Sequence, residues 1–252
     1  MAFDRAVAVE EFWQARGRGE YFPSAWVDRL TLDQAYQIQL GMIDRRVAGG
    51  ERHIGWKVGL TAKPIQEQFG FHEPVFGCIL QSEPSGSTLR AAELIAPGFE
   101  SELCLRMGQD LSGTVTMAQA RAAVAGVHPA LEIIETRGDL SAQIALAMAD
   151  NAQQKMVVLG EPVALADKRL DQVACRVDLN GATVAEGVGA AVLGDPLNSV
   201  VWLAGKLREF GRTIRAGDIV MTGSFVRQFP LTKGDAVRVM FNGIGAVEVR
   251  VG

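Results

Sequence analysis

The sequence predicts an α+β fold, in which a helical N-terminal portion leads into a β-rich remainder. Two observations predict it. Up to about residue 50 the apolar residues recur at helical spacing, and beyond Arg52 the chain breaks into short β-branched segments separated by glycines. We therefore expect a helical portion over residues 1–50 and a β-rich domain over residues 51–252, without a linker between them.

Two helices are expected in the first portion. Residues 7–16 form a short amphipathic stretch that Gly17 interrupts. Thr31 is a good N-cap for a second helix, and the pair Gly49-Gly50 would end it. The apolar face of this second helix would consist of Ala35, Ile38, Met42 and Val47.

Two further helices are expected within the β-rich part. Residues 116–127 form one that is rich in alanine. In the other, Asp195 is the N-cap, Pro196 the first helical residue and Gly211 the C-terminal stop. The small residues at 187–194 suggest close backbone packing or close approach to a ligand. They lack the glycine spacing and the lysine of a nucleotide site, so we expect none.

Glu100 and Glu102 belong to one expected strand. Strand side chains alternate, so both carboxylates share the face opposite Phe99, Leu103 and Leu105. Adjacent carboxylates repel each other, and a hard divalent cation such as Mg²⁺ or Mn²⁺ favours such oxygen ligands. An exposed edge strand with two solvated acids is the alternative that this motif leaves open.

A third carboxylate, Glu132, lies in the apolar, β-branched run 128–137, which is typical of a buried strand. His128 is expected at the start of this strand. A glutamate there is costly unless it is paired or bound to a metal. Glu135 faces the other way on a strand, where Arg137 is available as an ion-pair partner. Glu132 is therefore a candidate for the same site as the pair at 100 and 102.

Lys57 lies in an apolar segment bracketed by Gly55 and Gly59. Desolvation is expected to lower its pKa towards neutrality, which suits a general acid or base. The alternative is a lysine on an edge strand whose ammonium group reaches solvent.

These segments together resemble the 2-keto-4-pentenoate hydratase / 4-oxalocrotonate decarboxylase family, a branch of the fumarylacetoacetate hydrolase superfamily. The resemblance covers residues 31–252 and rests on ordered motifs: G-W-K-V-G-L-T, P-V-F-G, E-S-E, P-A-L-E-I-I-E-T-R, A-D-N-A, L-G-D-P-L-N-S-V-V-W-L-A and A-G-D-I-V-M-T-G-S. It implies a fumarylacetoacetate-hydrolase-like catalytic core, and a catalytic lysine at Lys57. It also implies a Mg²⁺ or Mn²⁺ site on Glu100, Glu102 and Glu132.

The function implied by the resemblance is that of a metal-dependent lyase acting on a 2-oxo or 2-hydroxydienoate from aromatic catabolism. Hydration is the main interpretation and decarboxylation of 4-oxalocrotonate the alternative. Hydratases of this family commonly carry an acid where this chain has Val75, whereas the decarboxylase branch more often has an aliphatic residue. We expect a small 2-oxo acid as substrate and a homo-oligomer as the assembly.

Further residues are assigned to the surroundings of the substrate. Besides Val75, Asp150 in the A-D-N-A segment would hold the site by hydrogen bonds, or else cap a helix. Thr222 and Ser224 flank a predicted turn whose N–H and hydroxyl groups could bind a carboxylate, although an ordinary turn is the alternative. The cations available for a second substrate carboxylate are Lys63, Arg106 and Arg137.

Two other functional classes compete with the lyase. An acylpyruvate hydrolase of the same superfamily needs a histidine–glutamate pair to activate water, and His53, His72 and His128 show no such pairing in the sequence. A non-catalytic scaffold would not need a lysine in an apolar strand. We therefore favour the lyase.

Composition excludes several kinds of partner. The net charge of −4 offers no basic face for nucleic acid or an anionic membrane. No apolar run approaches the roughly 18–20 residues that span a bilayer, and the N-terminus lacks the apolar core of a signal peptide. The 3 cysteines are widely spaced, which argues against a disulfide framework, so we expect a cytoplasmic protein.

Overall fold

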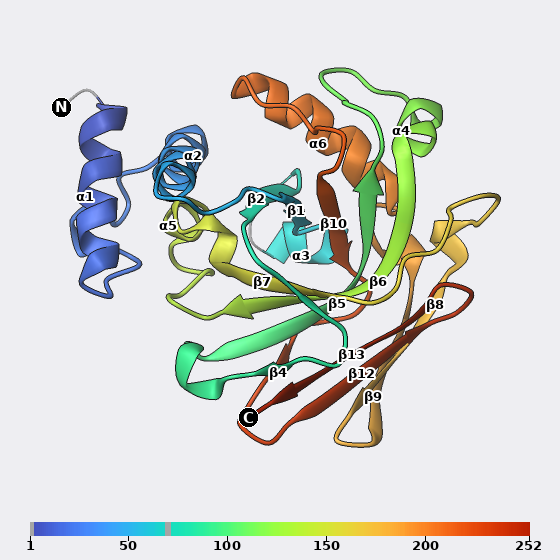
Figure 1. Cartoon of the computed structure of the whole chain (residues 1–252). Helices are drawn as coiled ribbons and strands as arrows, with labels where there is room; N and C mark the ends of the chain where they lie inside the picture. Colours follow the sequence, from blue (N-terminus) through green and yellow to red (C-terminus); the bar gives the residue numbers. More distant parts are fainter. Residues whose placement is uncertain (1–2, 69–71) are drawn as a thin grey trace.

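The computed structural model describes residues 3–68 and 72–252 and contains two β-sheets (Figure 1). In spatial order the larger sheet consists of β2 (Val75–Ile79), β1 (Gly55–Gly59), β10 (Ile219–Ser224), β5 (Pro97–Met107), β6 (Val124–Glu135), β7 (Gln154–Leu159) and β3 (Ser82–Pro84), with β11 (Phe229–Pro230) paired to β5. The smaller sheet consists of β4 (Thr88–Leu89), β13 (Gly245–Val251), β12 (Ala236–Phe241), β8 (Ala174–Leu179) and β9 (Ala182–Val188).

The helices lie in two groups around the larger sheet (Figure 1). One group contains α1 (Arg5–Gly17), α2 (Leu32–Ala48) and α5 (Ile144–Ala149), and the other contains α4 (Met117–Ala123) and α6 (Leu197–Glu209). The short α3 (Lys63–Gln68) follows β1. Within the described ranges, no helix combines the length and the apolar character that crossing a membrane requires. The mixture of helices and sheets confirms the α+β prediction.

The predicted N-terminal helices are confirmed, with one error on the buried face of α2. Thr31 caps α2 in a capping box with Gln34, and Gly49 follows its last residue. Ala35 is fully buried, but Val47 is 41% exposed. A step of five residues from Met42 turns about 140° around the helix, which carries residue 47 away from the core.

The helical portion shares its core with the β-rich part. The buried amide of Gln39 on α2 donates to the carbonyl oxygens of Phe76 (3.2 Å) and Met148 (2.8 Å). The ring of Tyr36 stacks on that of Phe76 with centroids 4.2 Å apart. Residues of α2 therefore pack directly on the strand next to β1.

The long antiparallel strands β5 and β6 form the centre of the larger sheet. The predicted helix over 116–127 is too long, because α4 ends at Ala123 and Val124 already pairs with Met107 in the sheet. His128 lies inside β6 rather than at its entry, and its Nδ1 is 2.8 Å from the carbonyl oxygen of Gly160. Pairing with β5 thus extends the strand at the expense of the helix.

The small-residue segment before α6 is explained by close backbone packing. A Cβ atom at Gly189 would lie 1.9 Å from the Leu170 carbonyl oxygen, and one at Gly187 would lie 2.4 Å from that of Phe225. The helix α6 begins at Leu197, one residue later than predicted, and the Asp195 carboxylate accepts a hydrogen bond from the Leu197 N–H (2.9 Å).

Candidate active site

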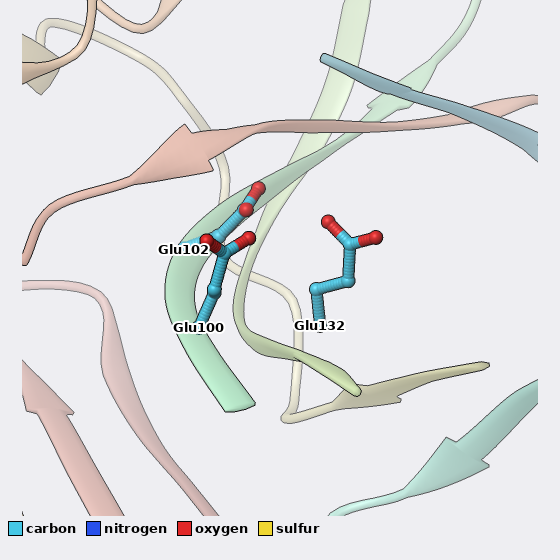
Figure 2. A group of neighbouring side chains, drawn as sticks. All are labelled: Glu100, Glu102 and Glu132. Atoms are coloured by element: carbon cyan, nitrogen blue, oxygen red, sulfur yellow. The ribbon is translucent and has the colours of Figure 1, made fainter. Parts of the chain in front are cut away.

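Three glutamates meet on one face of the β5–β6 pair. Glu100 lies directly opposite Glu132 in the register, and Glu102 follows two residues later on the same side of β5. Each glutamate offers a carboxylate oxygen within 4.8 Å of the others. Figure 2 shows the three carboxylates on the same side of the two strands. The structure therefore brings together the acids that the sequence singled out.

The surroundings of these carboxylates leave several oxygens unpaired. Glu102 and Glu132 are completely buried, whereas Glu100 is half-buried. Glu102 Oε2 accepts a hydrogen bond from the Gly223 N–H (2.7 Å). Among the described residues, the other oxygen of Glu102 and both oxygens of Glu132 accept no hydrogen bond, and Glu132 Oε1 has only the ion-pair contact with Lys57 Nζ at 3.4 Å. Such groups are costly unless a cation or another donor satisfies them.

Burial raises the pKa of all three carboxyl groups. It raises the pKa of Glu132 to about 7, although the Lys57 ammonium group acts in the opposite direction. The pKa of Glu102 is raised well above its ordinary value by burial and then by the charges of Glu132 and Glu100. Burial also raises the pKa of Glu100. A cation placed between the three groups would favour their charged forms.

Lys57 occupies an interior strand and faces the glutamates. Its strand β1 lies between β2 and β10, so the edge-strand alternative is wrong. The side chain is buried, and Nζ lies 3.4 Å from Glu132 Oε1. The predicted lowering of its pKa is also wrong for the protein without a cation. Burial alone lowers the pKa of Lys57, but the charges of the three glutamates outweigh it, and the pKa is raised.

A cavity of about 550 Å³ opens onto this group. Lys57, Val75 and Glu100 all line it, and a Cβ atom at Gly59 would lie 3.3 Å from Val75 Cγ2 and 3.4 Å from Lys57 Nζ. The lining residues that the sequence did not single out are Gly59, Leu60, Ile134, Thr136, Gly138, Asp139, Leu140, Ser141, Met148, Ala152, Gln153 and Gln228. Several of them lie just after β6 or the A-D-N-A segment, which is the signal that could have found them.

Asp150 supports the cavity without lining it. Its carboxylate accepts hydrogen bonds from Arg137 Nε (2.5 Å) and Arg16 Nη1 (3.1 Å). The next residue, Asn151, bonds through its side-chain amide to both the N–H (2.7 Å) and the carbonyl oxygen (2.8 Å) of Cys78 on β2. The A-D-N-A segment therefore holds a cavity strand in place through Asn151, and Asp150 is also the C-cap residue of α5 (Ile144–Ala149), the other alternative considered for it.

Arg137 is not free to bind a second substrate carboxylate. Its side chain is 2% exposed, and it pairs with Glu135 at 2.8 Å, as predicted, in addition to Asp150. Arg106 and Lys63 are exposed and lie outside the residues that line the cavity. The three cations considered from the sequence thus contribute no positive charge to the cavity lining.

The predicted turn at Thr222 and Ser224 is wrong, because both residues belong to strand β10 beside β5. The Thr222 hydroxyl donates to the Leu103 carbonyl oxygen (2.9 Å), and the Ser224 hydroxyl accepts from the Ser101 N–H (3.2 Å). The Gly223 N–H is already bonded to Glu102. These hydrogen bonds hold β10 and the carboxylate cluster in place, and neither hydroxyl lines the cavity.

Comparison with known proteins agrees with this geometry. Residues 73–252 match the profile of the fumarylacetoacetate (FAA) hydrolase C-terminal domain. The chain belongs to the fumarylacetoacetate hydrolase family. The predicted resemblance is therefore confirmed, although this profile begins after Lys57 and the N-terminal helices.

Relatives similar to this chain include proteins named as hydratases. The chain is 35% identical over 231 residues to the 2-hydroxyhexa-2,4-dienoate hydratase of Comamonas testosteroni, covering 88% of this chain and 86% of that protein. It is 35% identical over 255 residues to the 2-keto-4-pentenoate hydratase of Paraburkholderia xenovorans (strain LB400), covering 96% and 93%.

Among solved structures of the fumarylacetoacetate hydrolase family, the chain is similar to the 4-oxalocrotonate decarboxylase of Pseudomonas putida G7, complexed with magnesium and adipate. The TM-score is 0.93 and the sequence identity 30%, with 100% of this chain and 99% of that chain covered. The predicted fold with a fumarylacetoacetate-hydrolase-like core is thereby confirmed.

Proposed function

We propose that the protein is a divalent-metal-dependent lyase that adds water to a 2-hydroxy-2,4-dienoate. The observation that carries this proposal is the convergence of three carboxylates, two of them fully buried, and Lys57 beside one cavity. The relatives named as hydratases at 35% identity support the same reaction type.

The residues at the cluster fit Mg²⁺ or Mn²⁺. Glu100, Glu102 and Glu132 would hold the ion, since they supply hard oxygen ligands, several of them without another partner. When bound, such an ion supplies Lewis-acid stabilisation of the negative charge that develops on the oxygens of a 2-oxo acid.

Lys57 is proposed to move the proton. Its buried ammonium group lies 3.4 Å from Glu132 and on the cavity lining, where it would carry that proton. It would donate that proton to the terminal carbon of the dienol, and the resulting neutral amine would take up the proton that the enol hydroxyl loses. Water then adds to the resulting conjugated enone. The apolar neighbours of Lys57 limit the access of other water molecules to the amine.

The cavity lining favours hydration over decarboxylation. Lys57 is the single cationic side chain among the described residues of the lining, and it already pairs with Glu132. The remaining wall is largely apolar, with Leu60, Ile134 and Met148 among its members. A substrate with one carboxylate and an uncharged tail suits this wall better than a dicarboxylate, whose second charge would lose its hydration without a partner.

Decarboxylation of 4-oxalocrotonate is the second candidate. It is favoured by the TM-score of 0.93 to a decarboxylase and by Val75, where hydratases commonly carry an acid. An acylpyruvate hydrolase has less support, because no histidine occurs among the lining residues that the structure describes.

We also propose a cytoplasmic homo-oligomer. The three free, buried cysteines suit a reducing compartment. The exposed apolar side chains of Val184 and Val188 on the edge strand β9 suit a subunit contact.

Incubation of the purified protein with Mg²⁺ tests the proposal. We expect the ultraviolet absorbance of 2-hydroxypenta-2,4-dienoate to disappear without release of CO₂, and 4-oxalocrotonate to react more slowly. Rapid CO₂ release from 4-oxalocrotonate together with an unreacted dienoate would assign the decarboxylase instead. Inertness towards both compounds would contradict the lyase altogether.

A further inference from the structure

One wall of the cavity is made by a segment without helix or strand, residues 136–143, which we call the wall segment. Within it, Thr136, Gly138, Asp139, Leu140 and Ser141 line the cavity. The Asp139 carboxylate folds the segment onto itself by accepting hydrogen bonds from the Ser141 N–H (2.9 Å) and hydroxyl (2.6 Å). Since no ladder or helix fixes the wall segment, its position depends on its other contacts.

The first of these contacts comes from the N-terminal portion. The aromatic ring of Phe22 lies against Gly138, where a Cβ atom would be 2.5 to 2.6 Å from three ring atoms. On the other side, Gln153 Nε2 donates to the Gly138 carbonyl oxygen (2.9 Å). Gly138 is therefore held between the ring of Phe22 and the amide of Gln153.

A second contact joins the end of the wall segment to the same portion. Gln143 Nε2 donates to Asp28 Oδ1 (2.9 Å), and the Asp28 N–H donates to Gln143 Oε1 (3.3 Å). Asp28 has a left-handed backbone (φ 57°), an arrangement that the two reciprocal bonds help to hold.

A third contact lies at the start of the wall segment. Arg137 and Arg16 share the carboxylate of Asp150, which ties helix α1 to this segment. The ring of Tyr21 has the guanidinium carbon of Arg16 at 5.1 Å and that of Arg137 at 5.4 Å from its centroid. Residues 16–28 thus contact the wall segment near its beginning, middle and end.

We propose that residues 16–28 determine which substrate tails the cavity accepts, with Phe22 as a positioning residue that acts through the wall segment. This inference rests on the proposed function, because it places the head of a 2-oxo acid at the glutamates. The tail is then left to the rest of the lining, of which the wall segment forms a large part. The matched family profile covers residues 73–252, so it includes the wall segment but not residues 16–28, which contact it.

The test uses binding rather than turnover. The Mn²⁺-loaded wild type is titrated calorimetrically with pyruvate, 2-oxobutanoate and 2-oxopentanoate, alongside Phe22→Ala and Gln143→Glu. The second variant keeps the shape of the side chain but sets a carboxylate against Asp28. Trp13→Ala is the matched control, because it removes an exposed ring of α1 that contacts Arg45.

In the wild type, the affinity for 2-oxopentanoate should differ from the affinity for pyruvate, since one methylene in an apolar pocket is worth about 10-fold or more. We expect this difference in affinity, expressed as the ratio of the two, to become roughly 5-fold smaller in both variants. Mn²⁺ affinity should not change, and Trp13→Ala should keep the wild-type ratio. Amide hydrogen exchange at residues 138–143 should become faster in both variants.

Several results would overturn the inference. Faster exchange with an unchanged ratio would mean that the N-terminal portion orders the wall segment without choosing the tail. Unchanged exchange would mean that the contacts do not hold the segment. If Phe22→Ala does not fold, Gln143→Glu decides the matter alone. A wild type that binds 2-oxo acids but hydrates no dienoate would contradict the proposed function only, because the binding ratios would still decide the role of Phe22.

Discussion

Glu102 is the carboxylate of the cluster that accepts a hydrogen bond from the Gly223 N–H, and it is the residue at which the metal proposal is tested. Replacing it by glutamine keeps an oxygen for the Gly223 N–H but removes one of three ligand charges. We expect Mn²⁺ affinity, measured by calorimetry, to fall by about 10- to 100-fold or more. Glu161→Gln, at an exposed acid, is the control. Unchanged affinity in Glu102→Gln would remove this residue from the ligand set.

Lys57 tests the proton-transfer proposal. Lys57→Met keeps the apolar bulk and removes the amine, so kcat should fall by about 10²- to 10⁴-fold, the usual contribution of a general acid or base. Mn²⁺ affinity should be retained or improved, since a positive charge 3.4 Å from Glu132 disappears. Lys63→Met, at an exposed lysine, controls for the loss of charge. Near-normal turnover in Lys57→Met would show that another group moves the proton.

At the scale of single residues, the sequence predicts which residues form the carboxylate cluster better than it predicts their pKa shifts. Alternation along a strand was enough to place Glu100 and Glu102 together, and a buried Glu132 suggested a shared partner. The direction of the Lys57 pKa shift was missed, because β10 and β5 separate its strand from β6. No spacing in the sequence shows that the sheet brings Lys57 Nζ to 3.4 Å from Glu132 Oε1.

At the scale of elements, strand β10 supports the carboxylates through one glycine. Gly223 has a left-handed φ of 110°, and a Cβ atom there would lie 2.4 Å from Thr61 Oγ1. Gly223→Ala should lower the free energy of unfolding by roughly 1–2 kcal/mol for the backbone and a further 1–3 kcal/mol for crowding. Mn²⁺ affinity should fall as well, since the bond to Glu102 is disturbed.

Gly181→Ala is the matched control for this prediction. Gly181 also has a positive φ (81°), but a Cβ atom there would meet nothing within 4 Å. It should show the backbone cost alone and leave Mn²⁺ affinity intact. Denaturant unfolding of both variants separates the two contributions, and equal losses would contradict the crowding argument.

The helix and the turn that were mispredicted are segments whose structure depends on pairing with the neighbouring strand β5. Val124 to Val127 read as the end of an alanine-rich helix, yet they form strand because β5 offers them partners. Thr222 and Ser224 read as a turn beside a glycine, yet both belong to β10, whose register against β5 shifts between Met221 and Ser224. By contrast, the cap at Thr31 is a local signal, and it was read correctly.

At the scale of the whole molecule, the buried acids link stability to pH. Without metal, Glu132 keeps its proton up to a pKa of about 7, whereas the unfolded chain releases it near the ordinary value of about 4.3. Between these values the folded state binds more protons than the unfolded state, so the free energy of unfolding falls as pH rises.

The Tm of EDTA-treated protein should therefore decline between about pH 4.3 and about pH 7 relative to Mn²⁺-saturated protein. Glu132→Gln should flatten this decline, because glutamine does not titrate. A flat profile for chelated wild type would show that the three carboxyl groups are satisfied in another way.

The overall arrangement of the molecule was only partly predictable from the sequence. The change of pattern near residue 50 indicated where the helices give way to strands, and the resemblance indicated the core. The contact of Phe22 with Gly138 was not predictable, because 115 residues separate Phe22 from Gly138 and neither carries a motif.

The composition of the carboxylate cluster also bears on how fast a substrate arrives. Three carboxylates and one ammonium group sum to −2, so a bound dication leaves the centre electrically neutral. A neutral centre in a protein of net charge −4 does not steer an anion over a distance. Consequently kcat/KM should change little with ionic strength, whereas a cationic funnel would show a steep fall as salt is added. Capture of the substrate would then depend on short-range contacts made after random encounter.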